Sequence, residues 1–352
     1  MDETRLLEIL SGERRGLSAA LSRWLLAGLS APYGAAVSAR NLAYDRGWLM
    51  SRRAAVPVIS VGNLTTGGTG KTPFTAFLAR ELQSRGLRPG LLSRGYRSLD
   101  GAENDEKRVL DRLCPGVPQV QNPDRVAGAE RAIREFGCEV LILDDGLQHR
   151  RLQRDVEIVL IDALRPWGFG RLLPRGLLRE PMSGLRRADL IVITRADQAS
   201  AARVAELRRK LAEIAPVPVA EVAFEPGRLI DGEGAESPLS SLEGRVCLAF
   251  CGIGNPEGFA ATLRSAGISA ELEVFPDHHH YTAADFERLR RKAEAIGAAA
   301  LVTTLKDLVK LPGDSLDGPS VLAVDQRVRV LHGANEIARL MDRFGSDRAR
   351  AA

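Results

Sequence analysis

The sequence predicts an α/β protein, with a parallel-sheet domain and a second, smaller α/β domain. Short apolar runs rich in β-branched residues alternate with segments in which apolar residues recur at helical spacing. This alternation is typical of strands joined by crossover helices. Two runs, in the stretches 57–73 and 139–149, end in polar clusters, and polar groups at strand ends fall on the ligand side of an α/β sheet. A chain of 352 residues can hold two domains.

The stretch 57–73 predicts a phosphate-binding loop, which makes the first domain P-loop NTPase-like. An apolar strand leads into a glycine-rich turn, Lys71 and Thr72 follow, and helical spacing begins at Phe74. Glycine lets backbone N–H groups surround phosphate oxygens, and the helix N-terminus adds a positive dipole. We expect Lys71 to reach the β- and γ-phosphates and the Thr72 hydroxyl to lie on Mg²⁺. Because the strict motif has glycine where this chain has Thr65, the alternative is a glycine-rich connection with a chance Lys-Thr.

The composition bounds the class of protein. Hydrophobic residues make up 45% and charged residues 27%, which is ordinary for a globular protein. The net charge of +4 suits acidic substrates or an anionic membrane surface better than DNA, and 5% aromatic residues argue against a base-stacking platform. The four cysteines lack metal or redox spacing, so we expect buried, reduced thiols at these positions: Cys114, Cys138, Cys247 and Cys251.

Residues 1–50 predict an amphipathic segment. Leucines and a tryptophan at helical spacing form one apolar stripe at Leu17, Leu21, Trp24 and Leu25, and arginines follow up to Arg53. The apolar run that begins at Trp24 is shorter than the roughly 20 residues that span a bilayer. One interpretation is a helix lying in a membrane interface. The alternative is an amphipathic helix packed on the protein's own core.

Three polar groups follow the first helix of the domain. The stretch 89–96, which includes Ser93, predicts a second strand that ends in a polar turn, and Asp105 lies in a segment expected to be a charged loop. The helix 124–136 begins with Asp124 as N-cap. Arg125 in its first turn opposes the helix dipole, which favours an anion-binding role over a solvated surface arginine.

The stretch 139–149 predicts a Walker B strand. Four apolar residues precede Asp144 and Asp145, an arrangement that carries an acid to Mg²⁺ beside a phosphate loop. Gln148 and His149 complete the cluster, and a solvated loop is the alternative. The later segment 166–181 is rich in glycine, proline and arginine and is too long for a simple connection, which favours a functional loop.

The rest of the chain predicts the second domain. A boundary is expected near residue 195, strands near 246–251 and 301–304, and a final helix at 335–344. Three of the five histidines stand at 278–280, where adjacent side chains cannot all face one metal ion, so acid–base or hydrogen-bonding work at His278 is favoured over metal binding.

Together these motifs resemble the tetraacyldisaccharide 4'-kinase family of lipid A biosynthesis. The resemblance is carried by residues 61–73 with Thr65 included, Ser93-Arg94-Gly95-Tyr96, Asp144-Asp145-Gly146-Leu147-Gln148-His149, Leu178-Arg179-Glu180-Pro181, Gly252-Ile253-Gly254-Asn255-Pro256, Phe275-Pro276-Asp277-His278-His279 and Thr303-Thr304-Leu305-Lys306-Asp307. It implies transfer of a phosphoryl group from ATP to the 4'-hydroxyl of a tetraacylated glucosamine disaccharide 1-phosphate, giving lipid IVA. It also implies a monotopic enzyme at the cytoplasmic face of the inner membrane, and no nucleic-acid partner.

The resemblance also implies roles for individual residues. The catalytic set is Asp105, His278, Lys71 and Arg125, with Asp105 as the base. The ATP-binding residues are Thr65, Thr66, Gly67, Gly68, Thr69, Gly70, Lys71 and Thr72, the Mg²⁺ ligands are Thr72, Asp144 and Asp145, and Ser93, Gln148 and His149 are further active-site residues. The implied organisation is a membrane-associating segment (1–50), a kinase core (51–194), a second domain (195–325) and a C-terminal segment that returns to the core (326–352).

Two departures and two rival functions remain. The family has Gly-Asp-Glu-Pro around its catalytic acid, whereas Asp105 stands in Asn-Asp-Glu-Lys, and Leu305 replaces a family glutamate. A metallochaperone-like GTPase switch would share the variant loop, and Thr304-Leu305-Lys306-Asp307 weakly mimics a guanine-reading motif. A soluble small-molecule kinase is the other rival.

Overall fold

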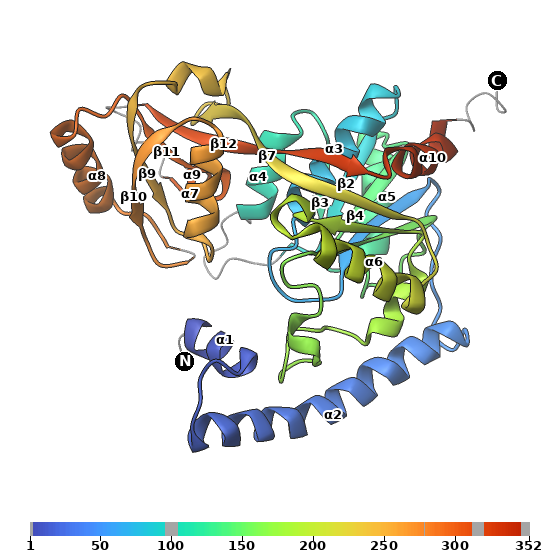
Figure 1. Ribbon diagram of the computed structural model, residues 1–352. Coiled ribbons are helices and arrows are strands. Elements are labelled where there is room, and N and C mark those ends of the chain that lie inside the picture. Colours follow the sequence, from blue (N-terminus) through green and yellow to red (C-terminus); the bar gives the residue numbers. More distant parts are fainter. Residues whose placement is uncertain (1–2, 96–104, 278, 312–319, 346–352) are drawn as a thin grey trace. The chain divides into compact units, whose positions relative to one another are not determined.

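The computed structural model describes residues 3–95, 105–277, 279–311 and 320–345 of the chain (Figure 1). The chain forms two compact units. The first comprises Met1–Gly95, Val117–Ala223 and Val330–Ala352, and the second comprises Tyr96–Gly116 and Phe224–Arg329. Two long strands, β7 (Val219–Asp231) and β12 (Val321–His332), each contribute to both units.

The first unit is built on a parallel sheet, as the sequence predicts. Its strand order is β3-β2-β4-β1-β5-β6-β7, and every neighbouring pair is parallel. The strands besides β7 are β1 (Val58–Asn63), β2 (Pro89–Ser93), β3 (Gln119–Gln121), β4 (Val140–Asp144), β5 (Val156–Asp162) and β6 (Leu190–Thr194). Their β-branched and leucine-rich runs are almost wholly buried, as expected for a parallel sheet covered on both faces.

The helices of the first unit cover both faces of this sheet. The helices are α1 (Glu3–Ser11), α2 (Leu17–Asp45), α3 (Lys71–Ser84), α5 (Arg125–Phe136), α6 (Ala201–Ile214) and α10 (Ala334–Gly345), with short 3-10 turns η1 (Gly168–Gly170), η2 (Met182–Arg187) and η3 (Ala196–Gln198). The chain passes from β1 through α3 toward one sheet edge, and from β3 through α5 and from β6 through α6 toward the other. Right-handed crossovers therefore place α3 on one face and α5 and α6 on the opposite face.

Strand register explains which side chains form the core under α5 and α6. Val58 pairs with Leu141, and Gly62 pairs with Val159, so alternate residues of β1, β4 and β5 share one face. Apolar side chains of α5 cluster with Leu141 and Leu143, and those of α6 cluster with Val159 and with β6. The alternate residues on this face of β1, β4 and β5 thus form one apolar layer that α5 and α6 cover.

The second unit is a smaller α/β structure, which agrees with the predicted class. The parallel order is β10-β9-β11-β12, and β8 pairs antiparallel with β7. Its elements besides β7 and β12 are α4 (Asp105–Leu113), β8 (Glu236–Ser237), η4 (Leu239–Leu242), β9 (Val246–Cys251), α7 (Pro256–Ser265), β10 (Ser269–Val274), α8 (Ala283–Ala295), β11 (Leu301–Thr304) and α9 (Leu305–Leu308). Two helix caps stabilise this unit: Asn255 accepts from the Gly258 N–H, and Thr282 forms a capping box with Asp285.

The boundary between the units differs from the one predicted near residue 195. The side chains of α6 share an apolar cluster with β5 and β6, so the first unit extends into the middle of β7. The predicted charged loop around Asp105 is also corrected. A helix, α4, begins at Asp105, because Asp105 and Glu106 suit its positive end and Val109, Leu110 and Leu113 bury one face.

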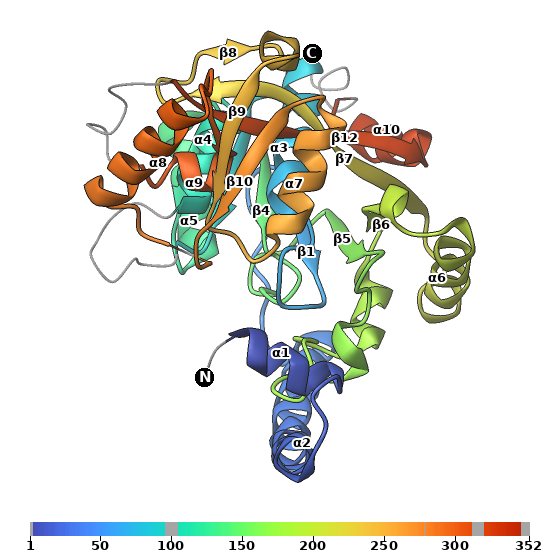
Figure 2. The ribbon, with the colours of Figure 1, turned by 60° about the vertical axis from the view of Figure 1, so that its left-hand side comes forward.

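The N-terminal segment forms one long helix, α2, with α1 beside it (Figure 2). The predicted apolar stripe faces outward: Leu17 is 91% exposed, Trp24 79% and Leu25 63%. The stripe therefore does not pack on the protein's own core; the opposite face of α2 makes the contacts with the 172–180 segment. None of the helices in the described part of the chain combines the length and apolar character needed to cross a bilayer.

Candidate active site

The phosphate loop joins β1 to α3 as predicted. Gly67 and Gly70 have left-handed φ angles of 111° and 85°, which glycine adopts without strain. A Cβ at Gly62 would lie 2.5 Å from the Cβ of Leu147, so the end of β1 packs directly on the segment that follows Asp145. This close approach places the loop beside the predicted Walker B cluster.

Asn63, the last residue of β1, holds the loop in shape. Its buried Nδ2 donates to the Thr65 carbonyl (2.8 Å) and to the Thr69 hydroxyl (2.9 Å). Its Oδ1 accepts from Lys71 Nζ at 3.2 Å. All three side-chain bonds join the two ends of the loop, so the amide sets the loop conformation and directs the lysine.

Asp145 lies between two cations. Lys71 Nζ is 3.4 Å from its Oδ1, and Arg179 NH1 is 2.7 Å from both carboxylate oxygens. Burial opposes ionisation of this carboxyl, but the charges of Lys71 and Arg179 outweigh it, and the pKa of Asp145 lies below its usual value. Its φ of 54° is unusual for a residue with a side chain, and the two ion pairs hold it there.

Asp144 ends β4, which pairs with Val61 of β1, so the register itself brings this carboxylate to the phosphate loop. It is 6% exposed, and its Oδ1 lies 3.4 Å from the Thr75 hydroxyl of α3. Thr72 lies on the first turn of the same helix. A hydroxyl and one or two carboxylates at a phosphate loop match the oxygen ligands that Mg²⁺ takes together with phosphates. Among the described residues, no group of three or more acids, histidines or cysteines has metal-binding spacing.

Arg125 and His149 form a second part of the site. Asp124 caps α5 as predicted, accepting from the Val126 N–H at 3.0 Å. The neighbouring Arg125 is 6% exposed and donates to the Pro123 carbonyl at 3.1 Å. Burial, and then the charges of Arg125 and Arg154, lower the pKa of His149 to about 4, so its imidazole is neutral at neutral pH.

The other predicted site residues are less closely grouped. Gln148 joins the phosphate loop, because its Nε2 donates to the Asn63 carbonyl at 3.0 Å. Ser93 ends β2, where its carbonyl accepts from the Asn122 N–H. Asp105 belongs to the second unit as the first residue of α4. His278 lies outside the described residues.

The structure adds residues that the sequence did not single out for this site. Besides Asn63 and Arg179, these are Thr194, whose hydroxyl donates to the Thr69 carbonyl at 3.0 Å, and Arg195, whose NH2 donates to the Gly68 carbonyl at 2.8 Å. Thr194 and Arg195 follow an apolar strand, so the strand-end rule could have found them. Arg179 lies in the long 166–181 segment, which carries no periodic signal.

Comparison with known proteins identifies relatives along nearly the whole chain. A sequence model of the family described as tetraacyldisaccharide-1-P 4'-kinase (LpxK) matches residues 22–344. A tetraacyldisaccharide 4'-kinase of Anaeromyxobacter sp. (strain K) is 40% identical over 94% of this chain and 91% of its own. One from Syntrophus aciditrophicus is 41% identical over 84% and 87%.

Among solved structures, LpxK from Aquifex aeolicus in complex with ATP is similar to this chain. The TM-score is 0.74 at 32% identity, and the match covers 92% of this chain and 99% of that one. This similarity extends through both compact units.

The depressed pKa of His149 predicts a pH-dependent stability. The unfolded histidine takes up a proton near pH 6.5 and the folded one only near 4, so the unfolded state binds more protons between these values. Stability should therefore fall as the pH drops through this window. Between pH 7 and pH 4.5 the wild type should lose about 2 kcal/mol more unfolding free energy than His149→Gln, which lacks the titrating group. Urea unfolding at the two pH values measures this, and equal losses in both proteins would contradict it.

Proposed function

Because the chain belongs to the tetraacyldisaccharide-1-phosphate 4'-kinase family, we propose that it transfers the γ-phosphoryl group of ATP to the 4'-hydroxyl of a tetraacylated glucosamine disaccharide 1-phosphate. The product would be lipid IVA. The observation that carries the proposal is the phosphate loop, in which Asn63 and Asp145 hold Lys71 beside the loop backbone. A fixed lysine and a helix N-terminus form a binding site for a polyphosphate.

Lys71 is the principal group for charge neutralisation in this proposal. Its ammonium contacts one amide oxygen and one carboxylate, so it is held in place before the nucleotide binds. Preorganised charge of this kind needs little rearrangement when charge develops on the transferring group. Arg125 acts with it, as the resemblance implies, and the neutral His149 beside Arg125 adds no like charge that would repel it. The remaining loop residues, 65–70 and 72, surround the phosphates through their backbone.

Thr72, Asp144 and Asp145 are the residues that would hold Mg²⁺. The chemistry that Mg²⁺ would supply at these residues is neutralisation of the phosphate charge. The chain's own part is to present oxygen ligands at one edge of the sheet, which the β1–β4 register does for Asp144.

Asp105 is the base in this proposal, with His278 as its partner. A sugar hydroxyl is a poor nucleophile and needs an acceptor for its proton. Asp105 lies in the first turn of α4, and its carboxylate would accept that proton.

The acceptor and the membrane would meet the outer face of α2. Its exposed stripe continues at the end of the helix with Trp48 (69% exposed) and Met50 (82%). Tryptophan, leucine and arginine on one amphipathic helix are typical of an interfacial anchor. The 166–181 loop is bonded to Ser30 and Tyr33 of this helix, and its arginines suit an anionic head group. The enzyme would thus work as a monotopic protein at the cytoplasmic face of the inner membrane.

An acceptor-dependent assay tests the proposed function. We expect the wild type to consume ATP only with the tetraacylated disaccharide 1-phosphate present, and GTP poorly. Lys71→Ala should lower the rate by about 10³-fold, because it removes a charge held against the phosphates. Lys210→Ala, at an exposed lysine of α6, is the matched control and should keep the wild-type rate. Preference for GTP, or equal rates without the lipid, would favour a rival function.

The role of Asp105 is tested with an isosteric change. Asp105→Asn should lower kcat by roughly 10²- to 10⁴-fold and leave ATP affinity unchanged, because the amide cannot accept the proton. Its cost in stability should stay below about 1 kcal/mol, the contribution of a first-turn acid. Asp111→Asn on the same helix is the control. Adding His278→Ala to Asp105→Asn should change kcat little, since residues that act as a unit are not additive. Fully multiplicative losses would refute the dyad.

The membrane role of α2 is tested on its outer face alone. Leu21→Ser, Trp24→Ser and Leu25→Ser combined should weaken binding to anionic phospholipid vesicles by roughly 100-fold or more, since each side chain contributes about 1.5 kcal/mol or more when buried in lipid. The inner-face bonds are untouched, so the melting temperature should change little. Phe136→Ser, at another exposed apolar residue, is the control in the vesicle sedimentation assay. Unchanged vesicle binding of the triple variant would exclude this helix as the anchor.

A further inference from the structure

The inner face of α2 is bonded to the segment beside the phosphate loop. Ser30 donates to the Leu172 carbonyl at 3.0 Å, and the Tyr33 hydroxyl donates to the Arg179 carbonyl at 2.7 Å. Two turns later, Asn41 Nδ2 donates to Glu180 Oε2 at 3.1 Å. Helix α2 thus has two distinct faces. One is apolar and exposed, and the other is polar and bonded to residues 172–180.

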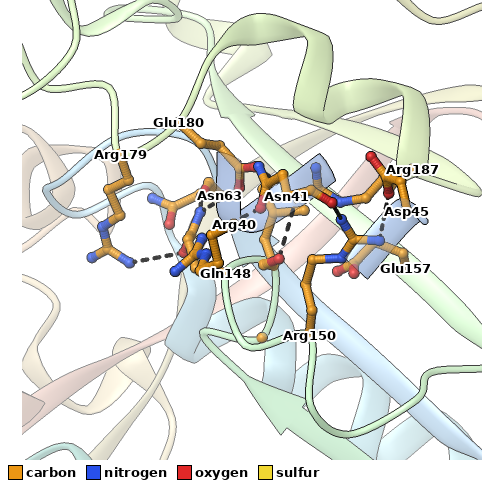
Figure 3. A network of polar contacts seen from close by, with 12 residues as sticks. Arg40, Asn41, Asp45, Asn63, Gln148, Arg150, Glu157, Arg179, Glu180 and Arg187 are labelled. Atoms are coloured by element: carbon orange, nitrogen blue, oxygen red, sulfur yellow. Dashed lines mark hydrogen bonds and ion pairs between the residues drawn. The ribbon is translucent and has the colours of Figure 1, made fainter. Parts of the chain in front are cut away.

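Glu180 is the point where these contacts converge (Figure 3). Its side chain is wholly buried, and a buried carboxylate requires several donors to offset its lost hydration. It has three: Asn41 at 3.1 Å, Gln148 at 2.9 Å and Arg187 at 2.7 Å. The donors come from three distant parts of the chain, so the carboxylate fixes their relative positions.

Gln148 connects Glu180 to the phosphate loop. Its Nε2 donates one hydrogen to Glu180 and the other to the carbonyl of Asn63, at 2.9 and 3.0 Å. Two acceptors on one side of the amide define its orientation. Asn63 then shapes the loop and receives Lys71. A continuous path of hydrogen bonds therefore leads from Asn41 to Lys71.

A second contact holds the end of α2 to the same region. Arg150, two residues after Gln148, donates to the Asn41 carbonyl at 2.9 Å and pairs with Asp45 at 2.7 Å. Asn41 is therefore held twice: its backbone carbonyl accepts from Arg150 of the segment that follows Asp145, and its side chain donates to Glu180 (Figure 3).

We propose that Asn41 is a positioning residue for the phosphate loop and acts through Glu180 and Gln148. The outer face of the same helix is the exposed apolar stripe, so a surface that binds α2 also sets the geometry of the nucleotide site. In its link to the membrane this proposal rests on the proposed function; the effect of Asn41 on ATP binding does not depend on the lipid acceptor.

The test is the affinity of the full chain for ATP with Mg²⁺, measured by calorimetry without lipid. Asn41→Asp replaces the donor by a second carboxylate facing Glu180, and we expect the dissociation constant to rise about tenfold, the effect of a coupling near 1.4 kcal/mol. Asn41→Ala should raise it less, because no repulsion is added. Glu180→Gln combined with Asn41→Asp restores a donor opposite an acceptor, so the double variant should bind ATP nearly as well as Glu180→Gln alone.

The controls separate positioning from folding. Ser38→Asp introduces the same charge at an exposed position one turn earlier on α2 and should leave the dissociation constant unchanged. Wild-type affinity in Asn41→Asp and Asn41→Ala, or losses that multiply in the double variant, would overturn the proposal, as would a lower melting temperature with unchanged affinity. If Asn41→Asp does not fold, Asn41→Ala decides. A wild type that binds ATP but does not phosphorylate the disaccharide would overturn only the proposed function.

Discussion

The Asp145 carboxylate is the interaction on which the rest of the site depends. It joins three segments that are far apart in the sequence: the Walker B turn, Lys71 of the phosphate loop and Arg179 of the long 166–181 segment. A partly buried carboxylate with one partner removed would leave an uncompensated charge, so each contact supports the other two. The same pairing keeps Lys71 extended along the loop. The positive charges of Lys71 and Arg179 are thus placed where they suit a polyphosphate.

The 166–181 segment, which follows β5, is positioned by the pairing of Arg179 with Asp145. Arg179 binds Asp145, its backbone N–H bonds the Leu64 carbonyl at 2.7 Å, and the next residue, Glu180, receives Asn41 and Gln148. The segment therefore connects α2 to the phosphate loop and is more than a surface loop. These polar contacts, together with the apolar packing of Trp167, Leu172 and Leu178, order this long connection. Through this segment, helix α2 is joined to the phosphate loop although its apolar face is exposed.

The sequence predicted the parts of this structure that local chemistry determines. The phosphate loop, the Walker B strand, the Asp124 cap and the second strand follow from short patterns, and the structure has them where expected. Arg179 and Asn41 could not be assigned, because their partners are set by strand order and loop path, which no local pattern encodes. The start of α4 at Asp105 was missed because charged residues at a helix N-terminus look like a loop until the buried side chains behind them are counted.

Polar clusters at strand ends are not all binding sites, and the second unit shows the difference. Thr304 to Asp307 follows β11 much as Asp144 and Asp145 end β4, and it resembles a guanine-reading motif. Here, however, Asp307 is fully buried, the Thr304 hydroxyl lies 2.6 Å from its Oδ2, and the cluster caps the short helix α9. Its polar atoms complete the local fold. Asp307 also pairs with Lys310, three residues later, at 3.7 Å. The cationic partners of Asp145 instead come from the phosphate loop and the 166–181 segment, and they can exchange a carboxylate for a phosphate. A binding site differs from a helix cap in that the side chains paired with its acid can also bind a ligand.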